Sequence, residues 1–367
     1  MMDLIHVTCQ HAISGIGRYG IELTRALKGS YPELIWYKPY RSDHADAYLH
    51  QEFSWIKGYP YRSFRNAHPY VLPFYIKRAL PSKDRTIYHA HWFLSGLAAS
   101  FTKPENTIIT MHDVSLLHVS EADPLYTWWY ENALNRFKNK KIPIIVVSEQ
   151  AKADTITYAR YPEELVHTIY NGIDHQRFYP LDEKTNRKNK NTFRIIYCGG
   201  LGERKNVGLL LKAYQHIEQK YDYETELIIA GAHPDKTKWP KLAKKLKLQT
   251  VEFTGFLPDE QMNAFYNSGD VMVFPSLYEG FGFSPLESMA AGTPVLSARG
   301  GSLEEISGGG AMLFDYSVVD LTEKMITVID KDGLRGKLRN KGITWSKNYN
   351  WTETANTTKN LYNHYFH

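Results

Sequence analysis

Short, nearly continuous apolar segments recur along the whole chain, and they restrict its fold more than any other feature. In the first half they lie near Leu4–Cys9, Leu34–Tyr37, Thr86–His89, Thr107–Met111, Pro143–Val147 and Val166–Tyr170. In the second half they lie near Phe193–Cys198, Glu226–Ala230, Val251–Thr254, Val271–Pro275 and Pro294–Ala298. Strands buried on both faces have this pattern, whereas half-exposed strands alternate apolar and polar residues. We therefore predict parallel sheets.

Helical patterns separate these segments, as in the apolar stripe of Val207, Leu210, Leu211, Tyr214 and Ile217. Alternation of strands and helices is typical of doubly wound α/β domains. A chain of 367 residues has room for two of them. The segment Asp182–Thr192 has no apolar side chain and suits a linker. We place the boundary near it, with domains over residues 1–176 and 177–345.

The composition excludes several classes of protein. The net charge is only +5, and the two cysteines, Cys9 and Cys198, cannot form a disulfide framework. Nucleic-acid binding is not expected from so small a charge. The N-terminus lacks the pattern of a secretory signal, and no segment reaches the roughly 18 apolar residues that a membrane span needs. We expect a cytoplasmic enzyme.

Gly15, Gly17 and Gly20 follow the first predicted strand, at the start of a predicted helix. Glycines allow a ligand to approach the backbone, and amides at a helix start attract phosphate. The G-x-G-x-x-G spacing also fits an NAD site, but no acidic residue follows about 20 positions later. A structural loop, a ligand loop and an NAD site all remain open here.

His112 and Asp113 come directly after the predicted strand Thr107–Met111. Ligands of open parallel sheets bind beyond the carboxyl ends of the strands. His112 therefore either donates a hydrogen bond to a substrate or only fixes a loop together with Asp113.

The second-half strand Phe193–Cys198 is followed by a glycine-rich turn and then by Arg204 and Lys205. Two adjacent cations at a helix start oppose the helix dipole unless an anion joins them. This combination predicts an anion site, and a solvated pair of charges is the alternative.

Between Pro275 and Pro294 the chain carries two acidic residues, Glu279 and Glu287. Ser284 suits a helix N-cap, so we predict a helix over Pro285–Ala291, with Glu287 either completing a capping box or binding a ligand. Glu279 precedes the helix, where its carboxylate can accept hydrogen bonds from sugar hydroxyls.

Taken together, these segments resemble the retaining glycosyltransferases of family 4. The most specific one is YEGFGFSPLESMAAGTPVL, which contains Glu279 and Glu287. The others, in the same order as in the family, are SGIGRY at Ser14–Tyr19, MHD at Met111–Asp113, VSE at Val147–Glu149, NGID at Asn171–Asp174 and GERKN at Gly202–Asn206. The resemblance implies the GT-B fold: two Rossmann-like doubly wound domains that face a central cleft. The end of this chain, about residues 346–367, resembles the final helix of the family, which would cross back to the first domain.

The resemblance also implies roles for single residues. Arg204 and Lys205 would hold the donor diphosphate, and Glu287 the ribose. Glu279 would bind the donor sugar together with the backbone near Phe281 and Gly282. His112 would contact a sugar hydroxyl or the reacting region. Gly15 and Gly17 would let their loop cover the phosphates.

We therefore expect a retaining hexosyltransferase that uses a nucleotide sugar, with GDP-mannose favoured over a UDP-sugar, and a saccharide or lipid-linked saccharide as acceptor. Arg204 and Lys205 supply positive charge for the leaving group, so we expect no metal and no further cofactor. Basic and aromatic residues interleave over residues 57–103, which suits peripheral contact with a membrane. An NAD-type oxidoreductase and a catalytically silent sugar-nucleotide-binding scaffold are the alternatives.

Overall fold

The structure is a computed structural model. It describes residues 2–10, 14–31, 34–40, 57–60, 68–82, 85–118, 123–181, 192–222, 224–231 and 235–366, with the backbone alone for 34–40, 57–60, 68 and 69. The chain divides into two units. The N-terminal unit comprises Met1–Gly172 and Trp351–His367, and the C-terminal unit comprises Ile173–Asn350.

The N-terminal unit is built on a seven-stranded parallel sheet with the order β3-β2-β1-β4-β5-β6-β7. Its strands are β1 (Asp3–Val7), β2 (Leu34–Tyr40), β3 (Lys57–Pro60), β4 (Thr86–Ala90), β5 (Thr107–Met111), β6 (Ile144–Val146) and β7 (Val166–Thr168). The strand order reverses between β1 and β4, which pair with each other. This reversal is the topological switch point, where doubly wound sheets bind their ligands.

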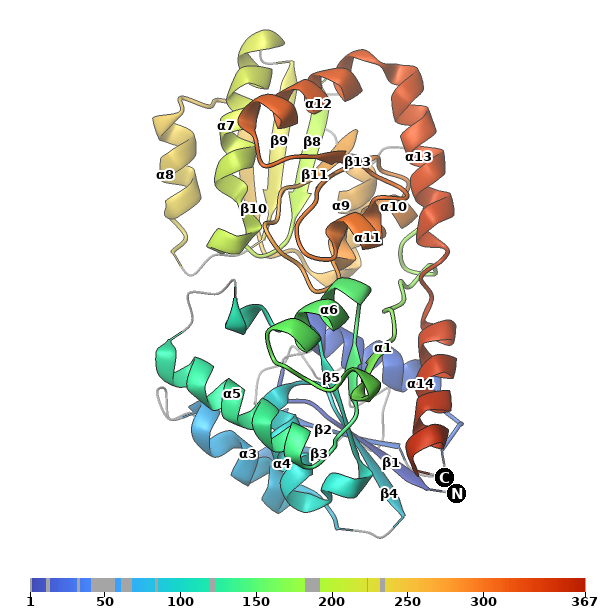
Figure 1. Ribbon diagram of the computed structural model, residues 1–367. Helices are drawn as coiled ribbons and strands as arrows, with labels where there is room; N and C mark the ends of the chain where they lie inside the picture. The colour runs from blue at the N-terminus through green and yellow to red at the C-terminus, as the bar shows by residue number, and fades with distance from the viewer. Residues whose placement is uncertain are drawn as a thin grey trace. The chain divides into compact units, whose positions relative to one another are not determined.

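Helices cover both faces of this sheet. They are α1 (Gly15–Leu27), α3 (His68–Ala79), α4 (Phe93–Thr102), α5 (Pro124–Asn139), α6 (Glu149–Thr157) and α14 (Trp351–Phe366). Alternate strand residues enter separate apolar clusters: Tyr88 packs in a cluster with residues of α4 and α5, whereas Ile87 packs in a cluster with residues of α1 and α14. The last helix, α14, lies against α1 and so belongs to this unit (Figure 1).

The C-terminal unit has a six-stranded parallel sheet with the order β10-β9-β8-β11-β12-β13. Its strands are β8 (Phe193–Cys198), β9 (Thr225–Ala230), β10 (Val251–Gly255), β11 (Val271–Phe274), β12 (Val295–Ala298) and β13 (Met312–Phe314). Its helices are α7 (Val207–Lys220), α8 (Lys238–Lys245), α9 (Met262–Ser268), α10 (Phe283–Ala290), α11 (Leu303–Ser307), α12 (Val318–Asp330) and α13 (Asp332–Ser346). The switch point lies between β8 and β11 (Figure 1).

The prediction of parallel strands is confirmed, since all eleven predicted segments form strands of these two sheets. The apolar stripe from Val207 to Ile217 is also confirmed, because all five of its residues are buried along α7. Two further strands, β3 and β13, were not predicted. Residues 182–191 of the predicted linker lie outside the described residues.

No helix within the described ranges is both long enough and apolar enough to cross a bilayer.

Candidate active site

The carboxyl edge of the C-terminal sheet brings two predicted segments together at the switch point. One follows β8 and runs through the glycine-rich turn to a 3-10 turn, Glu203–Lys205, and then to α7. The other follows β11 and runs from Ser276 to Gly282 before α10. Backbone hydrogen bonding joins them, because the Leu277 amide donates to the Arg204 carbonyl over 2.8 Å.

Hydrogen bonds from two aromatic side chains fix the backbone of the glycine-rich turn. Tyr197 donates its hydroxyl to the Gly200 carbonyl at 2.7 Å, and the Trp239 indole donates to the Leu201 carbonyl at 2.7 Å. A Cβ atom added at Gly200 or Gly202 would meet no atom within 4 Å. These glycines are therefore not required by packing, and the space beside them is open to a ligand.

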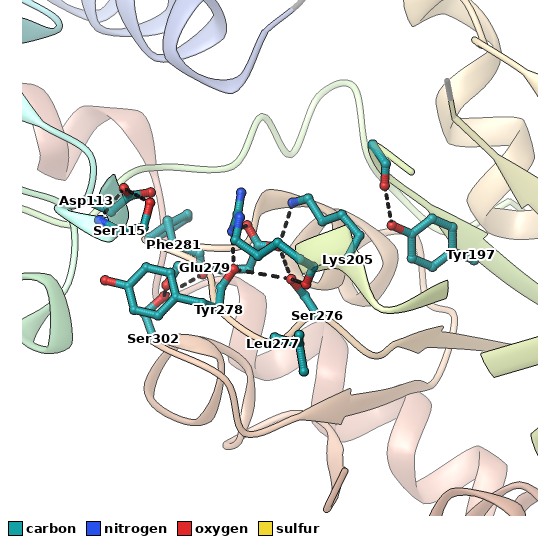
Figure 2. Close-up of polar contacts among 12 residues, drawn as sticks. Asp113, Ser115, Tyr197, Lys205, Ser276, Leu277, Tyr278, Glu279, Phe281 and Ser302 are labelled. Atoms are coloured by element: carbon teal, nitrogen blue, oxygen red, sulfur yellow. Dashed lines mark hydrogen bonds and ion pairs between the residues drawn. The ribbon is translucent and has the colours of Figure 1, made fainter. Parts of the chain in front are cut away.

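Arg204 and Lys205 both form ion pairs with Glu279 (Figure 2). Lys205 Nζ lies 2.5 Å from Glu279 Oε1, and Arg204 Nη1 lies 3.2 Å from Glu279 Oε2. Arg204 Nη1 also donates to the Tyr278 carbonyl. The Lys205 side chain is 19% exposed and that of Arg204 34%, so both cations reach the surface of the unit beside a carboxylate that is 10% exposed.

Glu279 stays ionised in this arrangement. Burial alone would raise its pKa, but the charges of Lys205 and Arg204 and hydrogen bonds from Lys205 and Ser276 together lower it below the usual value. A buried carboxylate with these partners can accept hydrogen bonds at neutral pH and carries no proton to donate. Its chemistry therefore suits binding of hydroxyl groups.

Three hydroxyl groups that sequence reasoning missed fix the Glu279 segment. The Ser276 hydroxyl donates to Glu279 Oε1 at 2.5 Å, and the Ser302 hydroxyl donates to the carbonyls of Glu279 and Phe281 at 3.0 and 3.1 Å. Tyr316 donates to the Ser276 carbonyl at 2.9 Å. Ser276 and Ser302 are fully buried. Only the place of Ser276, just after a predicted strand, could have indicated such a role.

The predicted capping box at Ser284 and Glu287 is wrong. Helix α10 begins at Phe283, and its N-cap is Gly282, whose φ of +96° favours glycine. A Cβ atom there would also lie 2.8 Å from Leu303 Cδ2. Ser284 consequently lies inside the first turn, and no side chain caps the helix.

Glu287 is 2% exposed and accepts a hydrogen bond from the Tyr266 hydroxyl at 2.7 Å. Its carboxylate and that of Glu279 thus have different partners. Phe281 is buried too, with its ring 5.2 Å from that of Phe283 and 5.7 Å from that of Tyr349. Phe281 therefore acts through its backbone if it contacts a ligand.

The remaining predicted residues lie in the N-terminal unit. His112 directly follows β5 and is 9% exposed. Burial lowers its pKa to about 3, while a hydrogen bond to the His91 backbone opposes this shift. Its Nε2 atom has no hydrogen-bond partner among the described residues. His112 is thus a neutral imidazole with one nitrogen available.

Asp113 does not simply pair with His112. Its carboxylate accepts hydrogen bonds from the Ser115 amide at 3.0 Å and the Ser115 hydroxyl at 2.6 Å, which fixes the loop. Gly15 and Gly17 lie in the first turn of α1, where the Ser14 hydroxyl caps the Gly17 amide at 3.0 Å. The parts assigned to His112, Gly15 and Gly17 stay predictions.

One Asp-x-Asp sequence, a common metal-binding pattern, occurs at Asp330-Lys331-Asp332 between α12 and α13. Asp330 accepts a hydrogen bond from the Tyr221 hydroxyl at 2.6 Å, and Asp332 forms an ion pair with Arg335 at 2.5 Å. Both carboxylates have structural partners, so this sequence is not assigned to metal binding.

Comparison with known proteins identifies the fold and the family. The family Glycosyltransferase Family 4 matches residues 13–177, and Glycosyl transferases group 1 matches residues 179–345. The O-antigen chain mannosyltransferase B of Escherichia coli is 24% identical over 98% of this chain and 99% of its own length.

Solved structures agree with the fold. Sucrose-phosphate synthase from Thermosynechococcus elongatus has a TM-score of 0.82 at 20% identity, over 99% of both chains. The Anabaena protein HepE, solved in complex with UDP and glucose, has a TM-score of 0.78 at 16% identity, over 98% of this chain and 99% of its own. The expected GT-B fold of two Rossmann-like units is confirmed. These matches give no support to the NAD-type oxidoreductase.

Proposed function

Because the chain belongs to the group 1 and family 4 glycosyltransferases, we propose that it transfers a hexosyl group, with mannose favoured, from a nucleoside-diphosphate sugar. The acceptor would be a saccharide or lipid-linked saccharide in glycan or polysaccharide assembly, and the anomeric configuration would be retained. The observation that carries this proposal is the joining of Arg204, Lys205 and Glu279 beside the open glycine-rich turn.

The charges at this turn suit departure of a nucleoside diphosphate. Transfer leaves negative charge on the diphosphate, and fixed cations stabilise that charge without reorganisation. Lys205 and Arg204 supply it, while Glu279 holds both side chains in place. The ionised Glu279 would then accept hydrogen bonds from the donor sugar, and Glu287 from the ribose.

We infer the base of the donor nucleotide from proteins that are similar to this chain. The Escherichia coli relative is named a mannosyltransferase, which favours GDP-mannose. The Anabaena structure contains UDP, which makes a UDP-sugar the alternative. A thermal-shift panel with GDP, UDP, GDP-mannose, UDP-glucose, UDP-N-acetylglucosamine and NAD tests this choice. A ligand at about 100 times its Kd stabilises the native state by roughly 2.7 kcal/mol.

We expect clear shifts with GDP and GDP-mannose. Shifts with the uridine compounds alone would show that the donor carries uracil instead of guanine, and the proposed enzyme class would stay the same. A shift with NAD alone would support the oxidoreductase. No shift with any compound would contradict nucleotide binding by the free protein and favour a donor that binds only once the acceptor is in place.

The reaction is expected to proceed without a divalent metal at the phosphates, because two side-chain cations already neutralise them. Turnover should survive EDTA. Complete loss that manganese restores would contradict this proposal.

Peripheral membrane contact is a further part of the proposal. Among the described residues of the 57–103 region, Phe74 and Tyr75 are 54% and 47% exposed on α3, beside exposed Lys77 and Arg78. Exposed aromatic rings next to cations suit an anionic lipid surface at the cytoplasmic face. Sedimentation with anionic vesicles at low salt should retain the protein, and a Phe74→Ser variant should bind less. No binding to anionic vesicles at low salt would contradict membrane contact.

A further inference from the structure

Three histidines meet inside the N-terminal unit, at the switch point of its sheet. His6 on β1 and His89 on β4 are paired in register, and His91 follows two residues later on the same face. All three are fully buried beneath the face that α1 and α14 cover. Their ring centroids lie 5.2, 4.9 and 4.9 Å apart, with planes at 76° to 87° to one another.

The ring nitrogens of these histidines converge. One nitrogen from each ring can be chosen so that all three lie within 4.8 Å of one another. Three imidazoles with ring nitrogens this close to one another supply the ligand set of a three-histidine metal site.

The partners of His6 fix its tautomer. The Thr24 hydroxyl donates its proton to the Gly20 carbonyl at 2.6 Å, so it can only accept from His6 Nδ1 at 2.8 Å. His6 therefore carries its proton on Nδ1, and Nε2, which lies 3.5 Å from the Tyr362 hydroxyl, keeps its lone pair. Metal-binding histidines are held in this way, by an outer hydrogen bond from the nitrogen that does not bind the metal.

His89 and His91 differ in how well protein groups satisfy them. His89 contacts the Tyr362 hydroxyl at 2.5 Å through Nδ1 and the Thr110 hydroxyl at 2.7 Å through Nε2. Tyr362 reaches His6 Nε2 only at 3.5 Å, the limit of a hydrogen bond. Neither ring nitrogen of His91 has a hydrogen-bond partner among the described residues. A fully buried imidazole without any partner carries a substantial desolvation cost.

A neutral imidazole carries a proton on one ring nitrogen and a lone pair on the other, and this is the form that binds a metal.

We propose that His6, His89 and His91 bind one Zn²⁺ ion within the N-terminal unit. Neutral imidazoles are borderline ligands that favour zinc over magnesium or calcium, which prefer oxygen. The Tyr362 hydroxyl lies beside His89 and His6 and would become the fourth ligand by giving up its hydrogen bond with His89 Nδ1. The ion would give His91 its missing partner and attach α14 to strands β1 and β4. Its role is structural and is independent of the proposed transfer reaction.

The test measures zinc in the full chain, made without a polyhistidine tag and refolded in the presence of Zn²⁺. After exhaustive dialysis against metal-free buffer, we expect about one tightly held zinc per chain by mass spectrometry. Refolding with Co²⁺ instead should give the visible absorption of four-coordinate cobalt. A chain that retains no zinc and shows no cobalt spectrum would overturn the proposal.

Variants locate the ion. His91→Gln should lower zinc retention roughly tenfold or more, because one ligand is lost. His216→Gln, which changes an exposed histidine on α7, is the matched control and should retain zinc fully. Equal zinc in the wild type and a folded His91→Gln protein would overturn the assignment, as would loss of the ion in the control. If His91→Gln does not fold, the cobalt spectrum of the wild type shows whether the histidine cluster binds a metal.

Discussion

The two parallel sheets share one strand order around their switch points, yet the polar groups at those points differ in kind. In the N-terminal unit they are uncharged histidines, of which His6, His89 and His91 are fully buried and His112 is nearly so. In the C-terminal unit they are the ions Arg204, Lys205 and Glu279. The same topology can therefore place either neutral or charged chemistry at a ligand site, and the side chains after the strands decide which.

Burial explains this difference. A histidine inside a unit loses its proton, because the charged form is poorly solvated there. Glu279 keeps its charge despite burial, because two cations lie within hydrogen-bonding distance. Neutral imidazoles suit hydroxyl groups, whereas fixed cations suit a diphosphate.

The largest difference should appear as pH falls. The pKa of each of the four histidines is lower in the folded unit than the 6.5 of an unfolded chain, so the unfolded state binds more protons below pH 6.5. Stability is therefore full above pH 6.5 and is lost as pH falls toward about 3. Hydrogen exchange at pH 7 and pH 5 should show protection lost first in the N-terminal unit. Earlier loss in the C-terminal unit would contradict the comparison.

Removing a cation should have the next largest effect. Lys205→Ala should reduce turnover by about 10²-fold or more, since a charge that stabilises the leaving diphosphate is lost. Folding should change little, because Lys205 lies at the surface of its unit. Lys212→Ala, at an exposed position of α7, is the control in the same steady-state assay. Normal turnover by a folded Lys205→Ala protein would remove Lys205 from this role.

Removing a neutral group should reduce turnover less than removing a cation does. His112→Ala should reduce turnover by about tenfold, the worth of an uncharged hydrogen bond. The loss should be insensitive to added salt, whereas the loss in Lys205→Ala should vary with it. Initial rates at two ionic strengths measure both. Equal salt dependence in the two variants would show that His112 acts as a charge.

The smallest effect is expected at Ser276, a positioning residue. Ser276→Ala should lower turnover about threefold and move the acidic limb of the pH profile upward, because the Ser276 hydrogen bond holds the pKa of Glu279 down. Ser276→Thr keeps the hydroxyl and should restore the profile. A lower rate with an unchanged pH profile would make Ser276 a packing residue only.

Sequence patterns predicted most of the fold, because strands buried on both faces leave continuous apolar segments. They missed β3, where Lys57–Pro60 contains glycine and proline, and β13, a short strand that closely follows three consecutive glycines, Gly308–Gly310. The N-cap of α10 was also misplaced. Ser284 has the better capping side chain, but the backbone at Gly282 needs a positive φ, and that decides where the helix begins.

The sequence predicted the residues of the site, but it did not predict the contacts between them. Arg204 and Glu279 are 75 positions apart, so only the order of the strands brings them together. Ser302 and Tyr316 act through backbone carbonyls, which leaves no pattern in the sequence. His6, His89 and His91 did leave one, as polar residues in or directly after apolar strands.

The most direct test of the ionic site compares GDP with guanosine by calorimetry, in the wild type and in Lys205→Ala. If Arg204 and Lys205 hold the diphosphate, GDP should bind the wild type at least about 100-fold more tightly than guanosine, since charge-assisted hydrogen bonds to phosphate supply the difference. Lys205→Ala should shrink that ratio by about tenfold or more and leave guanosine binding unchanged. An equal ratio in both proteins would contradict the account, because the diphosphate would then be held elsewhere.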